Sequence, residues 1–136
     1  MGYVQAMQIK RIHHVALLTT PELYAECKRF YTEILGFEII RETYRHARDS
    51  YKLDLAIQGH YQIELFSFPK YRERGSYPES KGLRHLSFEV DDIVAAVKHL
   101  TAKGVSTEAI RIDDLTEKRF TFFEDPNGQP LEIYET

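Results

Sequence analysis

At 136 residues, with 43% hydrophobic and 29% charged side chains, the chain is long enough for one compact domain and too short for two independent ones. A formal net charge of −3, with acidic and basic residues mixed along the chain, offers no basic stripe for a nucleic-acid backbone, so nucleic acid is excluded as an expected partner. No apolar run approaches the roughly 20 residues that cross a bilayer, the segment MGYVQAMQIK lacks a secretory apolar region, and the single cysteine cannot form an internal disulfide, so we predict a cytoplasmic protein without a membrane partner.

The first half of the chain predicts the order β-α-β-β-β. Residues 9–19 are rich in Val, Ile and Leu and end at Pro21, which is typical of a strand followed by a turn. From 21 to 35 the apolar residues recur mostly at three- and four-residue steps, and Gly36 supplies a helix stop. Three strands are then predicted at 37–43, 51–58 and 61–68, the last two joined by a Gly59-His60 turn.

The second half repeats this order after a loop at 69–82 that is rich in Pro, Gly, Ser and charge. A strand is predicted at 83–90, and a helix begins at Asp91 or Asp92 and stops at Gly104. Three further strands are predicted at 108–113, 118–124 and 129–134. We therefore predict a single α+β domain over 9–136, built from a βαβββ module at 9–68 and a second at 83–135, with a curved, cup-shaped mixed sheet and the helices outside.

One histidine and one glutamate recur at matching places in the two modules. In the first strand of each module a histidine precedes alternating apolar residues, as His14 and His85 do; in the last strand a glutamate lies between aliphatic residues, as Glu64 and Glu132 do. The sequence separations are similar as well: His14 and Glu64 are 50 positions apart, and His85 and Glu132 are 47 apart.

Strand alternation indicates where these four side chains point. Their apolar neighbours belong on the helix-covered face, so the histidines and glutamates are expected on the opposite, concave face. A carboxylate removed from water is unfavourable unless a cation or hydrogen-bond donors compensate it. We therefore predict that His14, Glu64, His85 and Glu132 bind one divalent metal ion with open coordination positions; nickel, cobalt, zinc, manganese and iron all suit this donor set.

The remaining histidines and the cysteine have simpler interpretations. Alternation points His13 away from the site. His46, His60 and His99 are interpreted as surface residues, because they fall in a loop, a turn and a helix. Cys27, on the apolar side of the first helix, is predicted to lie in the core.

Several segments together resemble the vicinal oxygen chelate superfamily, also called the glyoxalase, bleomycin resistance protein and dioxygenase superfamily. They are IHHVALLTT, FYTEILGFE, QIELF, GLRHLSFEVDDI and DPNGQPLEIYE, which span about 9–135. The stretches YRHARDSYKLDLA and KRFTFFEDPNG further resemble its YaeR-like glyoxalase I branch. The resemblance implies that His14, Glu64, His85 and Glu132 match the four ligand positions of the family.

The resemblance also implies a chemistry. Members of the glyoxalase I group bind a hemithioacetal, stabilise an enediolate on the metal and move a proton between adjacent carbons with a ligand glutamate as the base. Here Glu132 would be that base, with Glu64 as the second catalytic carboxylate. We therefore expect a metal-dependent lyase or isomerase acting on a small oxo or hydroxy carbonyl compound or its thiol hemithioacetal.

Two alternatives and one structural question stay open. A ferrous dioxygenase or an antibiotic thiol transferase would need two histidines and one glutamate, which leaves Glu64 surplus; a non-catalytic, drug-sequestering protein would not need the ligands at all. Bacterial glyoxalase I proteins carry an arginine where this chain has Leu18, so a glutathione cosubstrate is not implied. That arginine could be replaced by Arg45, Arg48, Lys52 or Arg119.

The superfamily resemblance favours a homodimer, although the cup could close within one chain or by exchange of modules between two.

Overall fold

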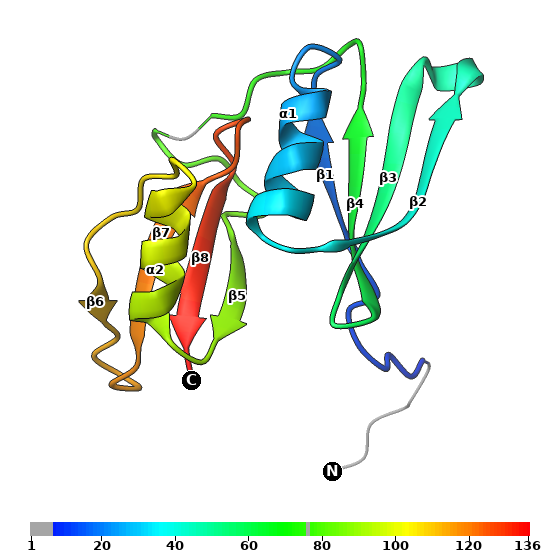
Figure 1. Ribbon diagram of the computed structural model, residues 1–136. Helices are drawn as coiled ribbons and strands as arrows, with labels where there is room; N and C mark the ends of the chain where they lie inside the picture. The colour runs from blue at the N-terminus through cyan, green and yellow to red at the C-terminus, as the bar shows by residue number, and fades with distance from the viewer. Residues whose placement is uncertain (1–6, 76) are drawn as a thin grey trace.

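The two halves of the chain fold into two sheets with a helix on each. The computed structural model describes residues 7–75 and 77–136 (Figure 1). The first half contains β1 (Val15–Thr19), α1 (Tyr24–Arg29), β2 (Glu38–Arg45), β3 (Ser50–Ile57) and β4 (His60–Ser67). The second half contains β5 (Leu86–Val90), α2 (Ile93–Ala102), β6 (Arg111–Ile112), β7 (Arg119–Glu124) and β8 (Pro130–Glu135).

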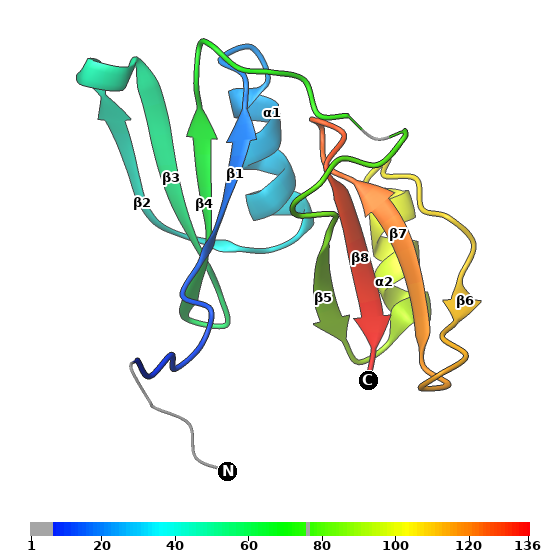
Figure 2. The same cartoon turned by 180° about the vertical axis from the view of Figure 1, so that it is seen from behind.

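The two sheets share one topology. Their strand orders are β1-β4-β3-β2 and β5-β8-β7-β6. The pairs β1–β4 and β5–β8 are parallel, and all the other neighbouring strands are antiparallel. Both helices lie on one side of the sheets (Figure 1), and the other side carries no helix (Figure 2). The predicted fold class, α+β with two βαβββ modules, is confirmed.

Three boundaries in the first half differ from the prediction. Residues 9–14 form no strand and are exposed, since β1 begins only at Val15. The first helix runs from Tyr24 to Arg29 and continues as a π-helical turn to Ile34. The hairpin turn lies at Gln58-Gly59, whose positive φ values of 52° and 79° match a primed turn.

In the second half, the helix and two of the three later strands follow the prediction closely. The Asp92 side chain caps α2 by accepting a hydrogen bond from the Ala95 N–H at 3.0 Å. The strand predicted at 108–113 is reduced to the two residues of β6. That shortening leaves an irregular segment between α2 and the sheet.

The core lies between the helices and the sheets and continues from one half of the chain into the other. Cys27 and Tyr31 are fully buried, which confirms the core prediction for the cysteine. Tyr31 Oη donates to Asp125 Oδ2 at 2.7 Å, and the Asn127 side-chain amide donates to Cys27 Sγ at 2.9 Å. These buried contacts fix the first helix against the turn between β7 and β8.

No helix in the described residues is long and apolar enough to cross a membrane.

Candidate functional site

The first histidine–glutamate pair lies across β1 and β4. Glu64 is paired in register with Ala16 on the parallel neighbour, two residues after His14. This register brings His14 Nε2 to 3.5 Å from Glu64 Oε2. The flanking residues Ile63 and Leu65 are buried under the helix, so the glutamate faces the helix-free side.

The second pair repeats this geometry across β5 and β8. Glu132 is paired in register with Ser87, again two residues after the histidine, and His85 Nε2 lies 3.5 Å from Glu132 Oε1. Leu131 and Ile133 are buried on the helix side. The two modules therefore hold their histidine and glutamate in the same register and at the same separation.

The two pairs do not meet within one chain. In Figure 1, β1 and β5 belong to different sheets and run in opposite directions, so the strand starts that follow the two histidines do not lie side by side. Across residues 7–75 and 77–136, no three His, Cys, Asp or Glu side chains gather around a common point. A single chain thus presents two half-sites, each with one imidazole and one carboxylate.

Glu64 is held by a polar network that the sequence did not predict. Tyr61 Oη lies 2.7 Å from Glu64 Oε2 and 2.9 Å from Asp54 Oδ1, within hydrogen-bonding distance of both carboxylates. Lys52 Nζ donates to Asp54 at 2.8 Å and lies 3.6 Å from Glu64 Oε2. The His14 ring also stacks on Tyr61, with centroids 5.0 Å apart. We refer to Lys52, Asp54 and Tyr61 as the Glu64 network.

The protonation states in the Glu64 network follow from its contacts. Burial, together with the bonds to Glu64 and Asp54, raises the pKa of Tyr61 far above its usual value, so the phenol stays a hydrogen-bond donor. Burial alone would raise the pKa of Asp54, but the bonds from Lys52 and Tyr61 outweigh it and lower that pKa. A charged Asp54 and a neutral Tyr61 therefore support Glu64.

A strand irregularity explains how Tyr61 reaches this face. Tyr61 and Glu64 are three positions apart, which in a regular strand would place them on opposite faces. Pairing shifts between Leu55 and Ala56, because Ala56 pairs with Tyr61 while Leu55 pairs with Ile63. The extra residue, Gln62, forms a bulge that turns Tyr61 onto the face of Glu64.

Glu132 lies in a different environment. Apart from His85, it makes no hydrogen bond or ion pair with any described residue. The position across from it on β7 is Phe122, where the first module has Asp54, and the His85 ring meets Phe122 edge-on at 5.0 Å. One half-site is therefore supported by polar groups and the other by an aromatic ring.

His13 does not follow the orientation predicted for it. Its Nδ1 lies 2.8 Å from His14 Nδ1, and its ring packs edge-on against Tyr61 with centroids 5.3 Å apart. Both histidines precede β1, so the alternation of side chains along a strand does not apply to them. His13 is therefore a neighbour of the first half-site.

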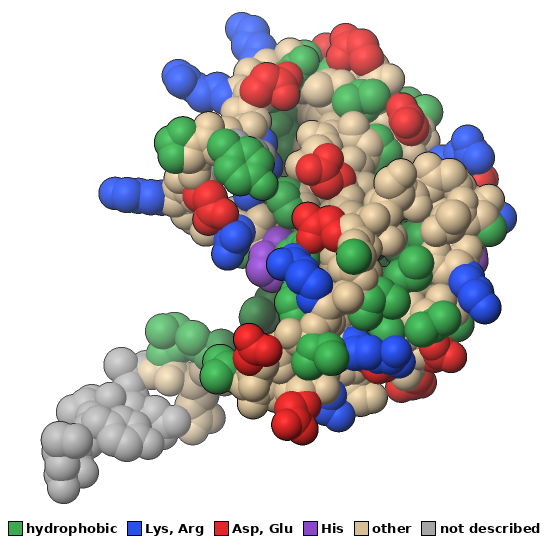
Figure 3. Space-filling view, turned by 90° about the vertical axis from the view of Figure 1, so that its left-hand side faces the viewer, with side chains coloured by type: hydrophobic (Ala, Val, Ile, Leu, Met, Phe, Trp, Pro, Cys, Tyr) green, Lys and Arg blue, Asp and Glu red, His purple; other side chains and the backbone are tan. Residues whose placement is uncertain are grey.

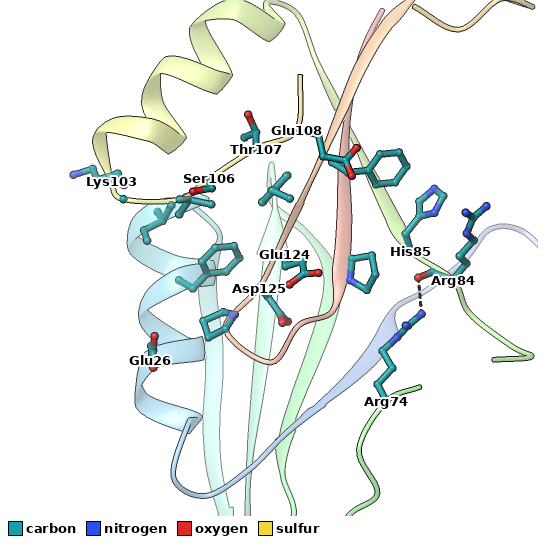
Figure 4. A pocket seen from close by; sticks show the side chains of 18 of the residues that line it. Glu26, Arg74, Arg84, His85, Lys103, Ser106, Thr107, Glu108, Glu124 and Asp125 are labelled. Atoms are coloured by element: carbon teal, nitrogen blue, oxygen red, sulfur yellow. Dashed lines mark hydrogen bonds between the residues drawn. The ribbon is translucent and has the colours of Figure 1, made fainter. Parts of the chain in front are cut away.

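The surface of the protein is hollowed, and one of its cavities reaches a predicted ligand. Figure 3 shows a histidine side chain at the bottom of a hollow, with basic side chains near its rim. Separately, an open cavity of about 950 Å³ lies between the second sheet and α1, and of the four predicted ligands only His85 lines it. Figure 4 shows His85 and Arg84 at one end of this cavity; the Arg74 guanidinium donates to the Arg84 carbonyl at 2.8 Å. This cavity is thus an approach to the second half-site only.

The donor atoms of each half-site suit a divalent ion. Two ligands bound at about 2.1 Å in a tetrahedral arrangement lie roughly 3.4 Å apart. The imidazole nitrogen and carboxylate oxygen of each pair are 3.5 Å apart. Mixed nitrogen and oxygen donors suit first-row divalent metals, and the network behind Glu64 is the kind of outer support that orients ligands.

Comparison with known proteins places the chain in a family. The profile of the Glyoxalase/Bleomycin resistance protein/Dioxygenase superfamily matches residues 11–133, and the chain belongs to this superfamily. It is 58% identical over 127 residues to the uncharacterized protein YaeR of Escherichia coli K12, covering 93% of this chain and 97% of that one. The predicted superfamily and its YaeR-like branch are confirmed.

Solved structures agree with this assignment. A glyoxalase family protein from Enterococcus faecalis is 45% identical and superimposes with a TM-score of 0.86, covering 95% of this chain and all of that one. A mutant of the fosfomycin resistance protein FosX from Listeria monocytogenes shares the fold alone at 17% identity, with a TM-score of 0.73 and coverage of 95% and 94%. That mutant was solved in complex with Mn(II) and a dihydroxypropylphosphonic acid, so this fold holds a metal ion in that protein.

Proposed function

We propose that this protein is a metal-dependent lyase or isomerase acting on a small oxo or hydroxy carbonyl compound or its thiol adduct. The observation that carries the proposal is the duplicated half-site, with one histidine nitrogen 3.5 Å from one glutamate oxygen in each module. His14, Glu64, His85 and Glu132 would hold one divalent ion together. Bound there, the ion would act as a Lewis acid that polarises a carbonyl oxygen of the substrate.

The separation of the half-sites favours a homodimer as the active form. If two copies associate about a twofold axis, the first half-site of one chain can face the second half-site of its partner. The same axis completes the reciprocal site, so one dimer would contain two equivalent sites. This arrangement uses the four ligands without disrupting the buried Tyr31–Asp125 contact that joins the modules within each chain.

The two glutamates would have different roles. The oxygens of Glu64 are engaged by Tyr61 and lie near Lys52, which favours a fixed ligand. Glu132 has no such donors among the described residues, so its carboxylate is available to accept a proton from a substrate carbon and return it to the neighbouring one. We therefore assign the role of base to Glu132.

Elemental analysis of the purified protein, followed by reconstitution with nickel, cobalt, manganese, zinc or ferrous ion, tests the metal site. We expect about one ion per chain, and a loss of about tenfold or more in affinity on His14→Ala or His85→Ala. His60→Ala, in the exposed hairpin, is the matched control and should bind as the wild type does. Stoichiometric binding that survives both ligand substitutions would overturn the site.

Proton exchange in a 2-oxoaldehyde thiol adduct, followed by NMR in deuterated water, tests the chemistry. Glu132→Gln should bind the adduct with nearly unchanged affinity but exchange it at least about a hundredfold more slowly. Glu89→Gln, on β5 and exposed, is the control and should exchange at the wild-type rate. An unchanged rate in Glu132→Gln would remove the assigned base, whereas binding of the adduct without any exchange in the wild type would favour a binding protein without catalysis.

A further inference from the structure

The four cations that the sequence offers in place of the missing arginine, Arg45, Arg48, Lys52 and Arg119, divide into two kinds in the structure. Arg119 donates to both Glu135 oxygens, at 2.8 and 2.9 Å, and Lys52 donates to Asp54 at 2.8 Å. These two charges are compensated within the chain. Arg45 and Arg48 form no hydrogen bond or ion pair through their guanidinium groups with any residue in the described ranges.

Arg45 and Arg48 instead lie at the two ends of an aromatic stack. The Arg45 Cζ atom lies 4.9 Å from the ring centroid of Phe66, and the Arg48 Cζ atom lies 5.0 Å from that of Phe68. The two phenylalanine rings stack on each other at 5.1 Å with an interplanar angle of 11°. We refer to Arg45, Phe66, Phe68 and Arg48 as the arginine–phenylalanine stack.

The stack occupies the same face of the first sheet as the predicted ligand Glu64. Phe66 lies two residues after Glu64 on β4, which places both side chains on one face about 7 Å apart along the strand. Its partner on β3 is Lys52, as Asp54 is the partner of Glu64. This is the face that carries no helix (Figure 2). The stack therefore begins where a molecule bound at Glu64 would extend along β4.

A comparison within the chain shows that an arginine lying over aromatic rings can also have a counter-charge. Arg111 also lies over aromatic rings, 5.0 Å from Phe120 and 5.7 Å from Phe122, but Glu108 accepts a hydrogen bond from it at 2.9 Å. Arg45 has no such partner among the described residues, and its Nε atom is covered without an acceptor. Buried polar groups usually have a hydrogen-bond partner, and none of the described residues supplies one to the Arg45 Nε atom.

Stacking also prepares the arginines to bind an anion. A guanidinium lying on a ring is held in one plane, and its N–H groups point outward, where they fit the two oxygens of a carboxylate or phosphate. The apolar surface beneath excludes water from one side of each cation, which strengthens its attraction for an anion.

We propose that the arginine–phenylalanine stack binds an anionic group at the far end of the substrate. The proposal rests on the proposed function, because it adds a second anchor to a substrate whose carbonyl end reaches the Glu64 half-site. The substrate class is then a small oxo or hydroxy carbonyl compound that carries a carboxylate or phosphate several bonds from the reacting carbons.

The first test compares two chelating probes of the same shape on the nickel-loaded protein. Glutaric acid monohydroxamate and its monoamide differ only in a carboxylate against a carboxamide. Calorimetry should show about tenfold or more tighter binding of the acid, since a charge-assisted bidentate contact is lost in the amide. The preference should vanish in Arg45→Gln/Arg48→Gln. Arg29→Gln, which removes an exposed arginine paired with Glu33, should retain it.

The second test uses inorganic phosphate on the metal-free protein and follows the arginine Nε–H signals by NMR. Shifts of two arginine signals that disappear in the double variant support the subsite independently of the metal. If these shifts occur but neither hydroxamate binds, the metal site fails and the anion subsite stands. If both hydroxamates bind with equal affinity, or if phosphate moves no signal assigned to Arg45 or Arg48, the anion subsite is overturned while the metal site is unaffected.

Discussion

The hydroxyl of Tyr61 lies 2.7 Å from a carboxylate oxygen of Glu64 and links that residue to Asp54. Replacing Tyr61 with Phe removes the hydroxyl and keeps the ring that stacks on His14. We expect metal affinity to fall by about tenfold to a hundredfold, the usual cost of losing an outer partner of a ligand. Metal titration by calorimetry measures the change.

The control for this substitution is Tyr134→Phe in the second module. Tyr134 donates to Asp113 at 3.0 Å and also bonds to Thr116, but it makes no hydrogen bond to Glu132. Its loss should leave metal affinity within about twofold of the wild-type value, because no predicted ligand loses a partner. Equal effects of the two substitutions would show that the Tyr61 hydroxyl has no special role at the metal site.

A shared site predicts that two inactive variants can restore each other. In a dimer of a His14→Ala chain with a His85→Ala chain, one of the two sites combines the intact His14 of one copy with the intact His85 of the other. Mixing the two variants after mild unfolding should therefore recover metal binding at about one ion per heterodimer. Sites formed within one chain would all remain damaged.

The proper comparison for that experiment is a mixture of the wild type with the double variant His14→Ala/His85→Ala. In a shared arrangement every mixed dimer then lacks one histidine in each of its two sites, so no mixed dimer holds an intact site. Recovery in the first mixture together with loss in the second identifies the exchange of modules between copies. No recovery in the first mixture, with dimers present by sedimentation, would rule out the shared arrangement.

Asp125 is buried and depends on Tyr31 for one of its hydrogen bonds, while the N–H groups of Asn127 and Gln129 supply others. Tyr31→Phe should lower the free energy of unfolding by about 1–3 kcal/mol, because a buried carboxylate oxygen loses its donor. Burial raises the pKa of Asp125 and the Tyr31 bond lowers it. The loss should thus be larger at pH 8, where the carboxylate is charged, than at pH 4.

Urea unfolding of Tyr31→Phe at the two pH values checks this expectation. The matched control is Tyr44→Phe, which removes an exposed hydrogen bond to Asp49 and should change stability by less than about 0.5 kcal/mol. A Tyr31 effect as small as that of the control would mean that the contact between the modules contributes little to stability.

The sequence predicted what depends on local pattern. The aliphatic neighbours of Glu64 and Glu132 predicted the face of each glutamate, because strand alternation needs no information beyond the strand itself. The helix cap at Asp92 could be predicted for the same reason, since a capping residue lies next to the helix that it begins. Each of these inferences uses residues within a few positions of one another.

Features that depend on pairing between strands were not accessible. The bulge at Gln62, which brings Tyr61 to the face of Glu64, has no signal in the local sequence, because regular alternation would put these two residues on opposite faces. The separation of the two half-sites follows from the opposite directions of β1 and β5, which no strand pattern encodes (Figure 1). Asp54 could have been found, since it lies between Leu53 and Leu55 as Glu64 lies between aliphatic residues.

The reactivity of Cys27 measures how tightly the two modules pack, because its sulfur is fully buried and accepts a hydrogen bond from Asn127. Burial, only partly offset by the contact with Thr19, raises the pKa of the thiol from 9.0 to about 11. The folded state therefore favours the neutral thiol. Its contribution to stability is complete below about pH 9 and is lost as the pH rises through about 11.

The native protein should accordingly react with a disulfide reagent such as dithionitrobenzoate at least about a hundredfold more slowly than the urea-unfolded chain at pH 8, since only the thiolate attacks and access is blocked. Asn127→Ala removes the hydrogen-bond donor and should open this region, so Cys27 should react faster in this variant than in the wild type. Asn127→Asp keeps the size of the side chain, and its Cys27 should react at a rate between those two. Rapid labelling of the wild type at pH 8 would mean that the first helix separates readily from the turn between β7 and β8.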